Sequence, residues 1–336
     1  MMTRSSVGVL CVSIVLAGCG QKPAPENAAG KAAENQVPSL TFPLQKTTAR
    51  LQRGQYLTTV AACFDCHSER LWKEPDAPPK PGMLAAGQVY PLEGLPGRLV
   101  APNLTPDKET GIGNASDEDI YKAITQGIGK DGRTLFPLMP YGHYRELTDE
   151  DLASIIVYIR TLPPVRHELP KTQLAPPVMA SLKPLPPRAG NAPAPDLSDP
   201  VKRGAYMGNL GSCFDCHTPV DAKGAPLPGM DYGGGMVLKG PWGEVASANI
   251  TPDPSGVPYY DEASFVETMR TGKVKGSRKL NVLMPVPYYR NMTDEDLKAL
   301  YAWVKTLKPV KHRVDNADKP TLCRICGQRH GLGALN

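Results

Sequence analysis

The most constraining feature of this sequence is a five-residue motif, Cys-Phe-Asp-Cys-His, that occurs at residues 63–67 and again at residues 213–217. The pattern C-x-x-C-H is typical of covalent attachment of a c-type haem, in which two thiols bind the porphyrin vinyl groups and the histidine lies under the iron. The copies begin 150 residues apart and lie within longer matching segments, which argues against chance and against two simple Cys-x-x-Cys disulfides.

The motifs therefore predict two covalently bound haem c groups. The predicted attachment sites are Cys63, Cys66, Cys213 and Cys216, and the predicted proximal iron ligands are His67 and His217. Aromatic residues make up only 6% of the chain, which suits a core packed around a large apolar ring.

The matching segments predict short helices joined by long loops. Arg-Gly-x-Tyr precedes each motif, and a glycine at the same place in both copies (Gly54 and Gly204) predicts close approach of another helix. Thr148 and Thr293 are each followed by Asp-Glu-Asp-Leu, which predicts an N-capped terminal helix in each copy. Further helices are expected at residues 49–62, from Ser116 to Gly127, and at residues 261–269.

The length of 336 residues favours two domains rather than one. Residues 163–200 hold 11 prolines and separate the copies, which favours a stiff, extended connector. The alternative is that this segment lies along both domains and fixes their orientation. The predicted divisions are a first domain at residues 47–165, a Pro-rich linker at 166–200, a second domain at 201–314 and a C-terminal tail at 315–336.

The beginning of the chain predicts export. Arg4 precedes an apolar stretch of 11 residues, which is too short to span a bilayer and is typical of a signal peptide at residues 1–18. The stretch ends in Leu-Ala-Gly-Cys and resembles the bacterial lipoprotein cleavage box, which implies acylation of Cys19 and a membrane anchor. The alternative is an ordinary signal peptide that leaves Cys19 as an odd thiol. Residues 19–46 are expected to form a flexible tether on the periplasmic side of a bacterial membrane, with Gly20 favouring the outer membrane.

The order of these segments resembles the class I cytochrome c fold, present twice. The Asn-Leu/Ile-Thr-Pro-Asp segments at residues 103–107 and 249–253 are similar to those in cytochrome c subunits of periplasmic alcohol and aldehyde dehydrogenase complexes, as are the Met-Pro loops. The resemblance covers residues 49–312 and implies an all-α fold of two tandem class I cytochrome c domains joined by the Pro-rich linker. Those subunits commonly carry three haem motifs, whereas this chain carries two.

The resemblance also implies that Met139 and Met284, each followed by a proline, are the distal iron ligands. A thioether is a soft, neutral donor, so Met/His ligation raises the reduction potential. Met83 and Met230 repeat as well and remain alternatives, although only Met139 and Met284 lie in the loop before the terminal helix.

Other candidate metal ligands have weaker support. His143 lies four residues after Met139, but Tyr288 stands at its place in the second copy. His167 and His312 correspond to each other and are expected to be surface or linker histidines, because they follow the helix that closes each copy.

The tail contains Cys323-x-x-Cys326 followed by Gly327 rather than by histidine, which argues against a third haem. The preferred interpretation is a disulfide in an oxidising compartment. A metal site that adds His330 is the alternative, and it has only three evident ligands.

These features predict an electron carrier rather than an enzyme, with no catalytic residues. Single electrons would pass along a periplasmic respiratory chain, from a dehydrogenase to a terminal oxidase or a soluble cytochrome. The alternatives are a dihaem enzyme such as a cytochrome c peroxidase, which needs one open iron, and a gas sensor, which needs a signalling domain. The net charge of +5 is mild and does not imply nucleic-acid binding.

Overall fold

The computed structural model describes residues 40, 42–91, 93–95, 97–188, 194–221, 224–276, 278–314, 321–327 and 329–330. The predicted signal peptide, Cys19 and most of the predicted tether lie outside the described residues. Within the described part, none of the helices has the length and apolar character that crossing a bilayer requires. We call residues 42–188 the first half and residues 194–330 the second half.

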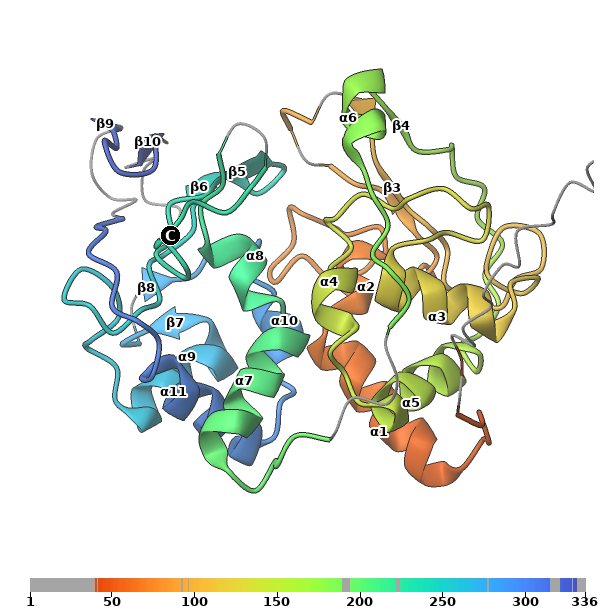
Figure 1. Ribbon diagram of the computed structural model, residues 1–336, viewed down its shortest axis with the longest axis horizontal. Helices are drawn as coiled ribbons and strands as arrows, with labels where there is room; N and C mark the ends of the chain where they lie inside the picture. Colours follow the sequence, from red (N-terminus) through yellow and green to blue (C-terminus); the bar gives the residue numbers. More distant parts are fainter. Residues whose placement is uncertain are drawn as a thin grey trace, which may run out of the picture. The chain divides into compact units, whose positions relative to one another are not determined.

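Short helices dominate both halves (Figure 1). The first half contains α1 (Thr48–Val60), α2 (Cys63–Cys66), α3 (Asp117–Gln126), α4 (Tyr141–Tyr144), α5 (Asp149–Ile159) and α6 (Pro176–Ser181). The second half contains α7 (Pro200–Leu210), α8 (Cys213–His217), α9 (Glu262–Thr271), α10 (Val286–Tyr289) and α11 (Asp294–Val304). The first five helices therefore recur in the same order, whereas α6 belongs to the Pro-rich segment.

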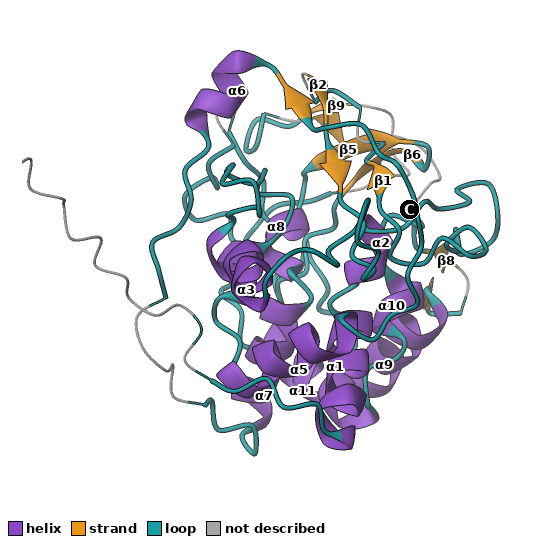
Figure 2. Ribbon diagram, turned by 90° about the vertical axis from the view of Figure 1, so that its right-hand side faces the viewer, coloured by secondary structure: helices purple, strands orange, loops and turns teal. Residues whose placement is uncertain are grey.

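Antiparallel two-stranded sheets connect some of the loops. The pairs are β1 (Gln88–Val89) with β3 (Val100–Ala101), β2 (Gly97–Arg98) with β4 (Gln173–Leu174), β5 (Val237–Gly240) with β6 (Gly243–Ala246), β7 (Lys273–Val274) with β8 (Arg278–Lys279), and β9 (Thr321–Leu322) with β10 (Arg329–His330). Figure 2 shows the larger helices gathered on one side and most strand pairs on the opposite side. Helices are therefore the main regular secondary structure of the described residues, as predicted, and they are accompanied by small sheets that were not predicted.

In each half the first long helix crosses the terminal helix, α1 against α5 and α7 against α11. A β-carbon added to Gly54 would lie 2.0 Å from the carbonyl oxygen of Ser154, and one added to Gly204 would lie 2.0 Å from the carbonyl oxygen of Ala299. Only glycine permits such an approach between helix backbones. The prediction that these two glycines mark a helix crossing is therefore confirmed.

The helix boundaries follow the predicted caps. Ser116 forms a capping box with Asp119 at the start of α3, and Gly127 ends that helix with φ of 69°. The Thr148 and Thr293 side chains accept hydrogen bonds from the third residue of α5 and α11. The apolar stripe of α5 is fully buried, as its spacing predicts, through Leu152, Ile155, Ile156 and Ile159.

The Pro-rich segment lies against the first half over residues 172–188. β4 pairs with β2, and the backbone N–H of Leu185 donates to the carbonyl of Gln126 at 2.9 Å. Farther along, the buried Arg188 pairs with Asp149 and donates to the carbonyl of Leu147 at 2.7 Å. Within the Pro-rich segment, prolines, which lack an N–H donor, alternate with residues that hydrogen-bond to the first half.

The halves contact each other through two tyrosines that bind the terminal helix of the opposite half. The Tyr206 hydroxyl of α7 donates to Asp151 Oδ2 of α5 at 2.5 Å and accepts from the backbone N–H of Thr148 at 3.2 Å. Asp151 also accepts from Arg53 of its own half at 2.7 Å. The buried carboxylate of Asp151 therefore accepts hydrogen bonds from donors in both halves.

The same arrangement occurs with the halves exchanged. The Tyr56 hydroxyl of α1 donates to Asp296 of α11 and accepts from the backbone N–H of Thr293 at 3.2 Å. Asp296 accepts from Arg203 of its own half at 2.6 Å. The interface is therefore reciprocal, since each half supplies one tyrosine and one aspartate to equivalent positions.

Candidate functional site

Each cysteine–histidine motif is preceded by a residue in the left-handed conformation and forms a short helix. Ala62 has φ of 53° and ψ of 35°, and Ser212 has φ of 51° and ψ of 36°. This conformation is uncommon for residues other than glycine, and it recurs at the same position in both halves. Within the helical turn, cysteines three residues apart lie on one face, so both thiols of a motif can reach the same ligand.

The two predicted proximal histidines are oriented by backbone carbonyls. His67 Nδ1 lies 2.8 Å from the carbonyl oxygen of Pro102, and His217 Nδ1 lies 2.7 Å from that of Ala248. A carbonyl only accepts, so Nδ1 carries the proton and the unshared pair of Nε2 is available to a metal. Burial lowers the pKa of both histidines, which favours the neutral imidazole that metal ligation requires.

An asparagine and a threonine hold the first of these carbonyls in place. Asn103 follows Pro102, and its Oδ1 accepts from the backbone N–H and the hydroxyl of Thr105 at 2.8 and 2.7 Å. Its Nδ2 donates at 2.7 Å to the carbonyl of Val165, which lies beyond the terminal helix. The Asn-x-Thr segment therefore joins the loop that orients His67 to the segment that follows α5.

The second half contains the equivalent set. Asn249 Oδ1 accepts from the backbone N–H and the hydroxyl of Thr251 at 2.9 and 2.8 Å, and Nδ2 donates to Val310 at 2.8 Å. The resemblance singled out these segments but did not predict that they position the histidine, for which the repeated Asn-x-Thr was the available signal.

The two predicted distal methionines lie in identical turns. Pro140 has φ of −82° and ψ of 51°, and Pro285 has φ of −77° and ψ of 51°. The carbonyl of Met139 accepts from the N–H two residues later at 2.8 Å, and that of Met284 does so at 2.7 Å. Each Met-Pro pair therefore forms an inverse γ-turn, in which the proline fixes φ. Both methionine side chains pack against the hydrophobic core.

A tyrosine connects each methionine loop to the cysteine motif of the same half. The Tyr144 hydroxyl donates to the carbonyl of Ala61 at 3.1 Å, and the Tyr289 hydroxyl donates to that of Gly211 at 2.5 Å. Both acceptors lie two residues before the first cysteine of a motif. The bond therefore fixes the loop that carries the methionine relative to the helix that carries the cysteines and histidine.

Burial governs the acidity of the cysteines in the first motif. Cys63 and Cys66 are free thiols, as are Cys213 and Cys216. Burial raises the pKa of Cys63 to about 12, so this sulfur favours a neutral form. Burial also raises the pKa of Cys66. The nearby Asp65 and Cys63, and Cys216 of the other half, raise the same pKa by smaller amounts.

His143 connects the first half to the second motif. Its Nδ1 lies 2.8 Å from Asn209 Oδ1 and its Nε2 lies 2.9 Å from Asp215 Oδ1. The hydrogen bond to Asp215 raises the pKa of His143 above its ordinary value. Both ring nitrogens are thus engaged at the interface, which differs from the alternative in which His143 ligates the first iron.

The expectation of surface histidines is wrong for His312, which is 1% exposed. His312 Nδ1 lies 2.8 Å from the carbonyl of Gly233, and the equivalent His167 Nδ1 lies 3.0 Å from that of Ala86. The ring of each histidine bonds to a loop that precedes it by about 80 residues. The predicted Cys323–Cys326 disulfide is also wrong, because Cys323 is a thiol in this structure.

These residues fit a c-type haem in each half. The donor set consists of two thiols on one helical face, a neutral imidazole with a fixed tautomer, and a methionine in a rigid turn fastened to the same helix. When bound, the haem supplies one-electron chemistry at iron, and the chain supplies attachment, orientation and an apolar core around it.

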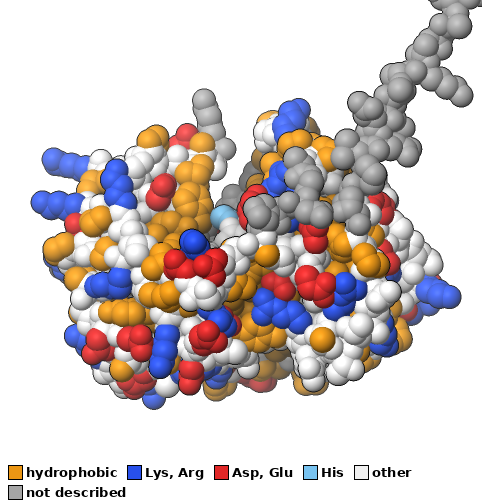
Figure 3. Space-filling view, turned by 60° about the horizontal axis from the view of Figure 1, so that its bottom comes forward, with side chains coloured by type: hydrophobic (Ala, Val, Ile, Leu, Met, Phe, Trp, Pro, Cys, Tyr) orange, Lys and Arg blue, Asp and Glu red, His pale blue; other side chains and the backbone are white. Residues whose placement is uncertain are grey.

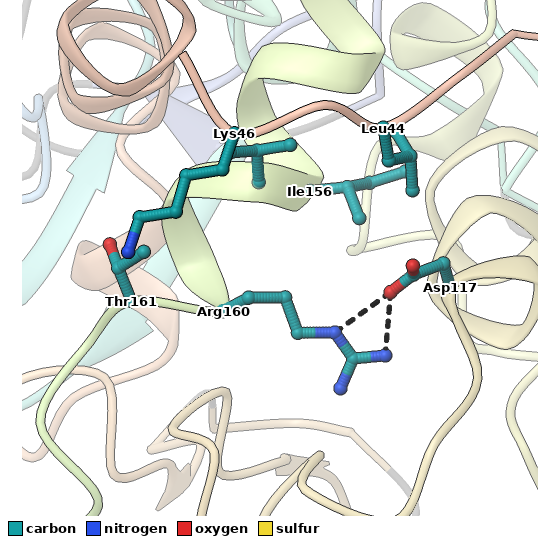
Figure 4. Close-up of a pocket in the computed structure, with 7 residues that line it drawn as sticks. Leu44, Lys46, Asp117, Ile156, Arg160 and Thr161 are labelled. Carbon is teal, nitrogen blue, oxygen red and sulfur yellow. Dashed lines mark hydrogen bonds and ion pairs between the residues drawn. The ribbon is translucent and has the colours of Figure 1, made fainter. Parts of the chain in front are cut away.

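A separate surface pocket contains none of these residues. It is lined by Leu44, Lys46, Asp117, Ile156, Val157, Arg160 and Thr161, and Figure 4 shows the Arg160 guanidinium directed at Asp117. Arg160 pairs with Asp117 at 2.8 Å and donates to the carbonyls of Ile112 and Ala115. The arginine therefore joins the end of α5 to the start of α3, which is a structural role.

Comparison with known proteins gives a consistent set of relatives. Residues 51–163 match the family model described as Cytochrome c. The chain is 30% identical to the fructose dehydrogenase cytochrome subunit of Gluconobacter japonicus, over 80% of this chain and 55% of that protein. It is 28% identical to the cytochrome c subunit of alcohol dehydrogenase (quinone) of Gluconobacter oxydans, over 78% of this chain and 55% of that protein.

This chain matches a third relative over most of that relative's length. The chain is 25% identical to a diheme cytochrome c-type protein of Cereibacter sphaeroides, over 79% of this chain and 88% of that protein. By contrast, the chain spans about half the length of the two dehydrogenase subunits. The segment order and the motifs thus predicted the correct relatives.

Proposed function

Because the chain carries a cytochrome c domain at residues 51–163 and is related to cytochrome c subunits of dehydrogenases, we propose that it is a dihaem electron carrier. The observation that carries this proposal is the recurrence, in the second half, of every bond that orients the histidine and methionine of the first half. The His–carbonyl bond, the Asn-x-Thr bonds, the Met-Pro turn and the Tyr bond all occur twice.

Each half is proposed to be a class I cytochrome c domain with one covalent haem c. His67 and Met139 ligate the first iron, and His217 and Met284 ligate the second. Two axial protein ligands leave an iron no position for substrate, which favours electron transfer over catalysis. The neutral thioether favours ferrous iron and raises the potential.

The proposed direction of electron flow is from a dehydrogenase, through both haems, to a terminal oxidase or soluble cytochrome. The relatives that are named as dehydrogenase subunits support the donor. Electron exchange with such partners suits small, short-lived interfaces. Figure 3 shows basic and acidic side chains interspersed over one face of the molecule, which suits reversible docking.

The proposed location is the periplasmic side of a bacterial membrane, where Cys19 carries the lipid anchor and the outer membrane is preferred. The support is the Leu-Ala-Gly-Cys sequence that follows the apolar stretch. A tether that begins at Cys19 would keep the carrier near its partners by raising their effective concentration. The Pro-rich segment, proposed as the linker between the domains, is braced against the first of them by the bonds of Leu185 and Arg188.

A redox titration with optical spectra tests the proposal. We expect two one-electron transitions and the absorption of Met-to-ferric-iron ligation in both haems. Met139→Ala and Met284→Ala should each lower one of the two potentials, by on the order of 100 mV, because axial ligands govern most of the potential range of haem proteins. Met83→Ala is the matched control, since Met83 repeats in the sequence without lying in a Met-Pro turn.

Mass measurement of the intact protein should show two covalent haems. A vacant or water-ligated iron in the resting protein would contradict the carrier and favour an enzyme. If the potentials fall in Met83→Ala and stay unchanged in Met139→Ala, the assignment of the distal ligand is wrong.

A further inference from the structure

Outside the haem motifs, the structure brings three soft metal ligands together near the C-terminus. A ring nitrogen of His312, Cys323 Sγ and Cys326 Sγ all lie within 4.8 Å of one another, and His312 Nε2 is 3.2 Å from Cys323 Sγ. In a tetrahedral zinc site, with Zn–S of about 2.3 Å and Zn–N of about 2.0 Å, ligand atoms lie about 3.5–3.8 Å apart. Small side-chain movements would therefore complete the geometry.

His312 is held as a metal ligand requires. Its ring is 1% exposed, and the carbonyl of Gly233 lies 2.8 Å from Nδ1, which directs Nε2 at the cysteines. Its backbone N–H donates to Ser255 at 2.9 Å, and its carbonyl accepts from Asn249 at 3.0 Å. Both the ring and the backbone are thus fixed before any metal binds, which reduces the entropy lost on binding.

The cysteines lie in a turn that suits thiolate ligands. The N–H of Gly327 donates to the carbonyl of Cys323 at 3.0 Å, and Gly327 has φ of 71°. The N–H of Ile325 is 3.4 Å from Cys323 Sγ, so the backbone of the turn lies against this sulfur. Cys326 is 6% exposed, so two of the three ligands are shielded from water.

We infer that His312, Cys323 and Cys326 bind one zinc ion. Two thiolates and a neutral imidazole form a soft donor set that suits Zn²⁺, and a water molecule fills the fourth position. Binding displaces the two thiol protons. The carbonyl of Gly233 precedes Gly234, whose N–H donates to the carbonyl of His217 at 2.7 Å. The metal would therefore fasten the C-terminal segment to the loop that supports the second haem motif.

The first half provides a matched control. His167 occupies the equivalent position, with its N–H bonded to Thr110 at 2.9 Å and its ring to Ala86 at 3.0 Å. The described residues place no cysteine pair around it, because the tail exists only after the second copy. Loss of the histidine from either half removes a similar structural bond, but only His312→Ala removes a zinc ligand.

The test is elemental analysis of the full-length, haem-loaded protein, purified under reducing conditions and dialysed against zinc. We expect about one zinc per chain in the wild type and in His167→Ala, and about one tenth of that in Cys323→Ser/Cys326→Ser. His312→Ala should weaken zinc binding at least about tenfold in competition with a chromophoric chelator. Counting zinc per polypeptide keeps the result independent of the haem number.

Absorption fine structure at the zinc edge provides a direct signature, with two sulfurs near about 2.3 Å and one nitrogen near about 2.0 Å. Equal zinc in the wild type and the double serine variant would overturn the inference. So would a Cys323–Cys326 disulfide that, once reduced, takes up no zinc.

Discussion

The two halves hold their cysteine–histidine motifs with the same bonds, but they are braced by different segments. In the first half, Arg160 and Arg188 join α5 and the Pro-rich segment to neighbouring elements through carboxylates and carbonyls. In the second half, Lys305 stands at the place of Arg160, and the cysteines of the tail lie beside His312. The difference teaches that the repeat retains the bonds that orient the motif histidine and the Met-Pro turn, whereas each half is attached to the remaining chain in its own way.

The largest expected effect concerns the helix crossings that the halves share. Gly54→Val and Gly204→Val would each place a β-carbon 2.0 Å from a backbone carbonyl oxygen. We expect each change to lower the free energy of unfolding by about 4 kcal/mol or more, because the helices must separate. Chemical denaturation followed by far-UV circular dichroism measures this. Gly142→Ala is the control, since a β-carbon there has no neighbour within 4 Å. Wild-type stability in either valine variant would contradict the crossing.

The next largest loss of unfolding free energy is expected for substitution of the two asparagines, and it should differ between the halves. Asn249 donates to the carbonyls of both Val310 and His312, whereas Asn103 donates to one carbonyl and to the hydroxyl of Thr110. We expect Asn249→Ala to cost about 3 kcal/mol and Asn103→Ala about 2 kcal/mol, because buried polar groups lose their partners.

Denaturant unfolding measures both asparagine variants, and Asn114→Ala, at an exposed position, is the control. A larger loss for Asn103→Ala would show that the second half does not depend more strongly on its asparagine.

The tyrosines test whether the interface is truly reciprocal. Tyr206→Phe and Tyr56→Phe each remove a hydrogen bond to an aspartate and leave a backbone N–H without its acceptor. We expect each to lower the free energy of unfolding by about 1.5–2 kcal/mol, the usual value for a bond to a charged group. Tyr158→Phe in α5 is the control. A loss for one tyrosine and none for the other would show that the interface is asymmetric.

The smallest expected effect on the unfolding free energy comes from His143. The halves differ at this position, because the second half has Tyr288 there instead of a histidine. The hydrogen bond to Asp215 raises the pKa of His143 above its unfolded value of about 6.5, and Asn209 and Glu146 add to this increase. Its stabilisation is therefore complete below about pH 6.5 and is lost as the pH rises through the raised pKa. The difference in unfolding free energy between wild type and His143→Gln should be about 0.5 kcal/mol at pH 5.5 and smaller at pH 8.5.

Guanidinium titrations at the two pH values measure the His143 effect. Asp215 is partly exposed, so solvent screens the pair and the effect stays small. A difference that is equal at both pH values would mean that the charge on His143 contributes nothing to the contact between the halves.

The local structure could be predicted from sequence wherever the cause was local. The caps at Ser116, Thr148 and Thr293 and the helix end at Gly127 each depend on a few neighbouring residues. Comparison of the two copies also predicted the crossing glycines, because a repeated helix-breaking residue needs a reason. The matched motifs singled out the residues that the structure holds in equivalent positions.

The remaining features depend on segments distant in sequence. Tyr56 was visible only as part of a repeated motif, and nothing near it indicates that its partner lies 240 residues away. His312 follows a terminal helix, where exposure is the usual outcome, but loops from elsewhere bury it. The disulfide was predicted from Cys323 and Cys326 alone, because nothing in the sequence places His312 beside them. Two-residue strands carry too few side chains to give a periodic signal.

The exchange of tyrosines between α1 and α11 and between α7 and α5 has the symmetry of an isologous contact, in which one surface patch binds its own copy. A single half with this surface would pair with a second copy of itself about a two-fold axis. In the chain itself the Pro-rich segment keeps both partners on one polypeptide, and a circular permutant that starts at the second half should assemble the same pair.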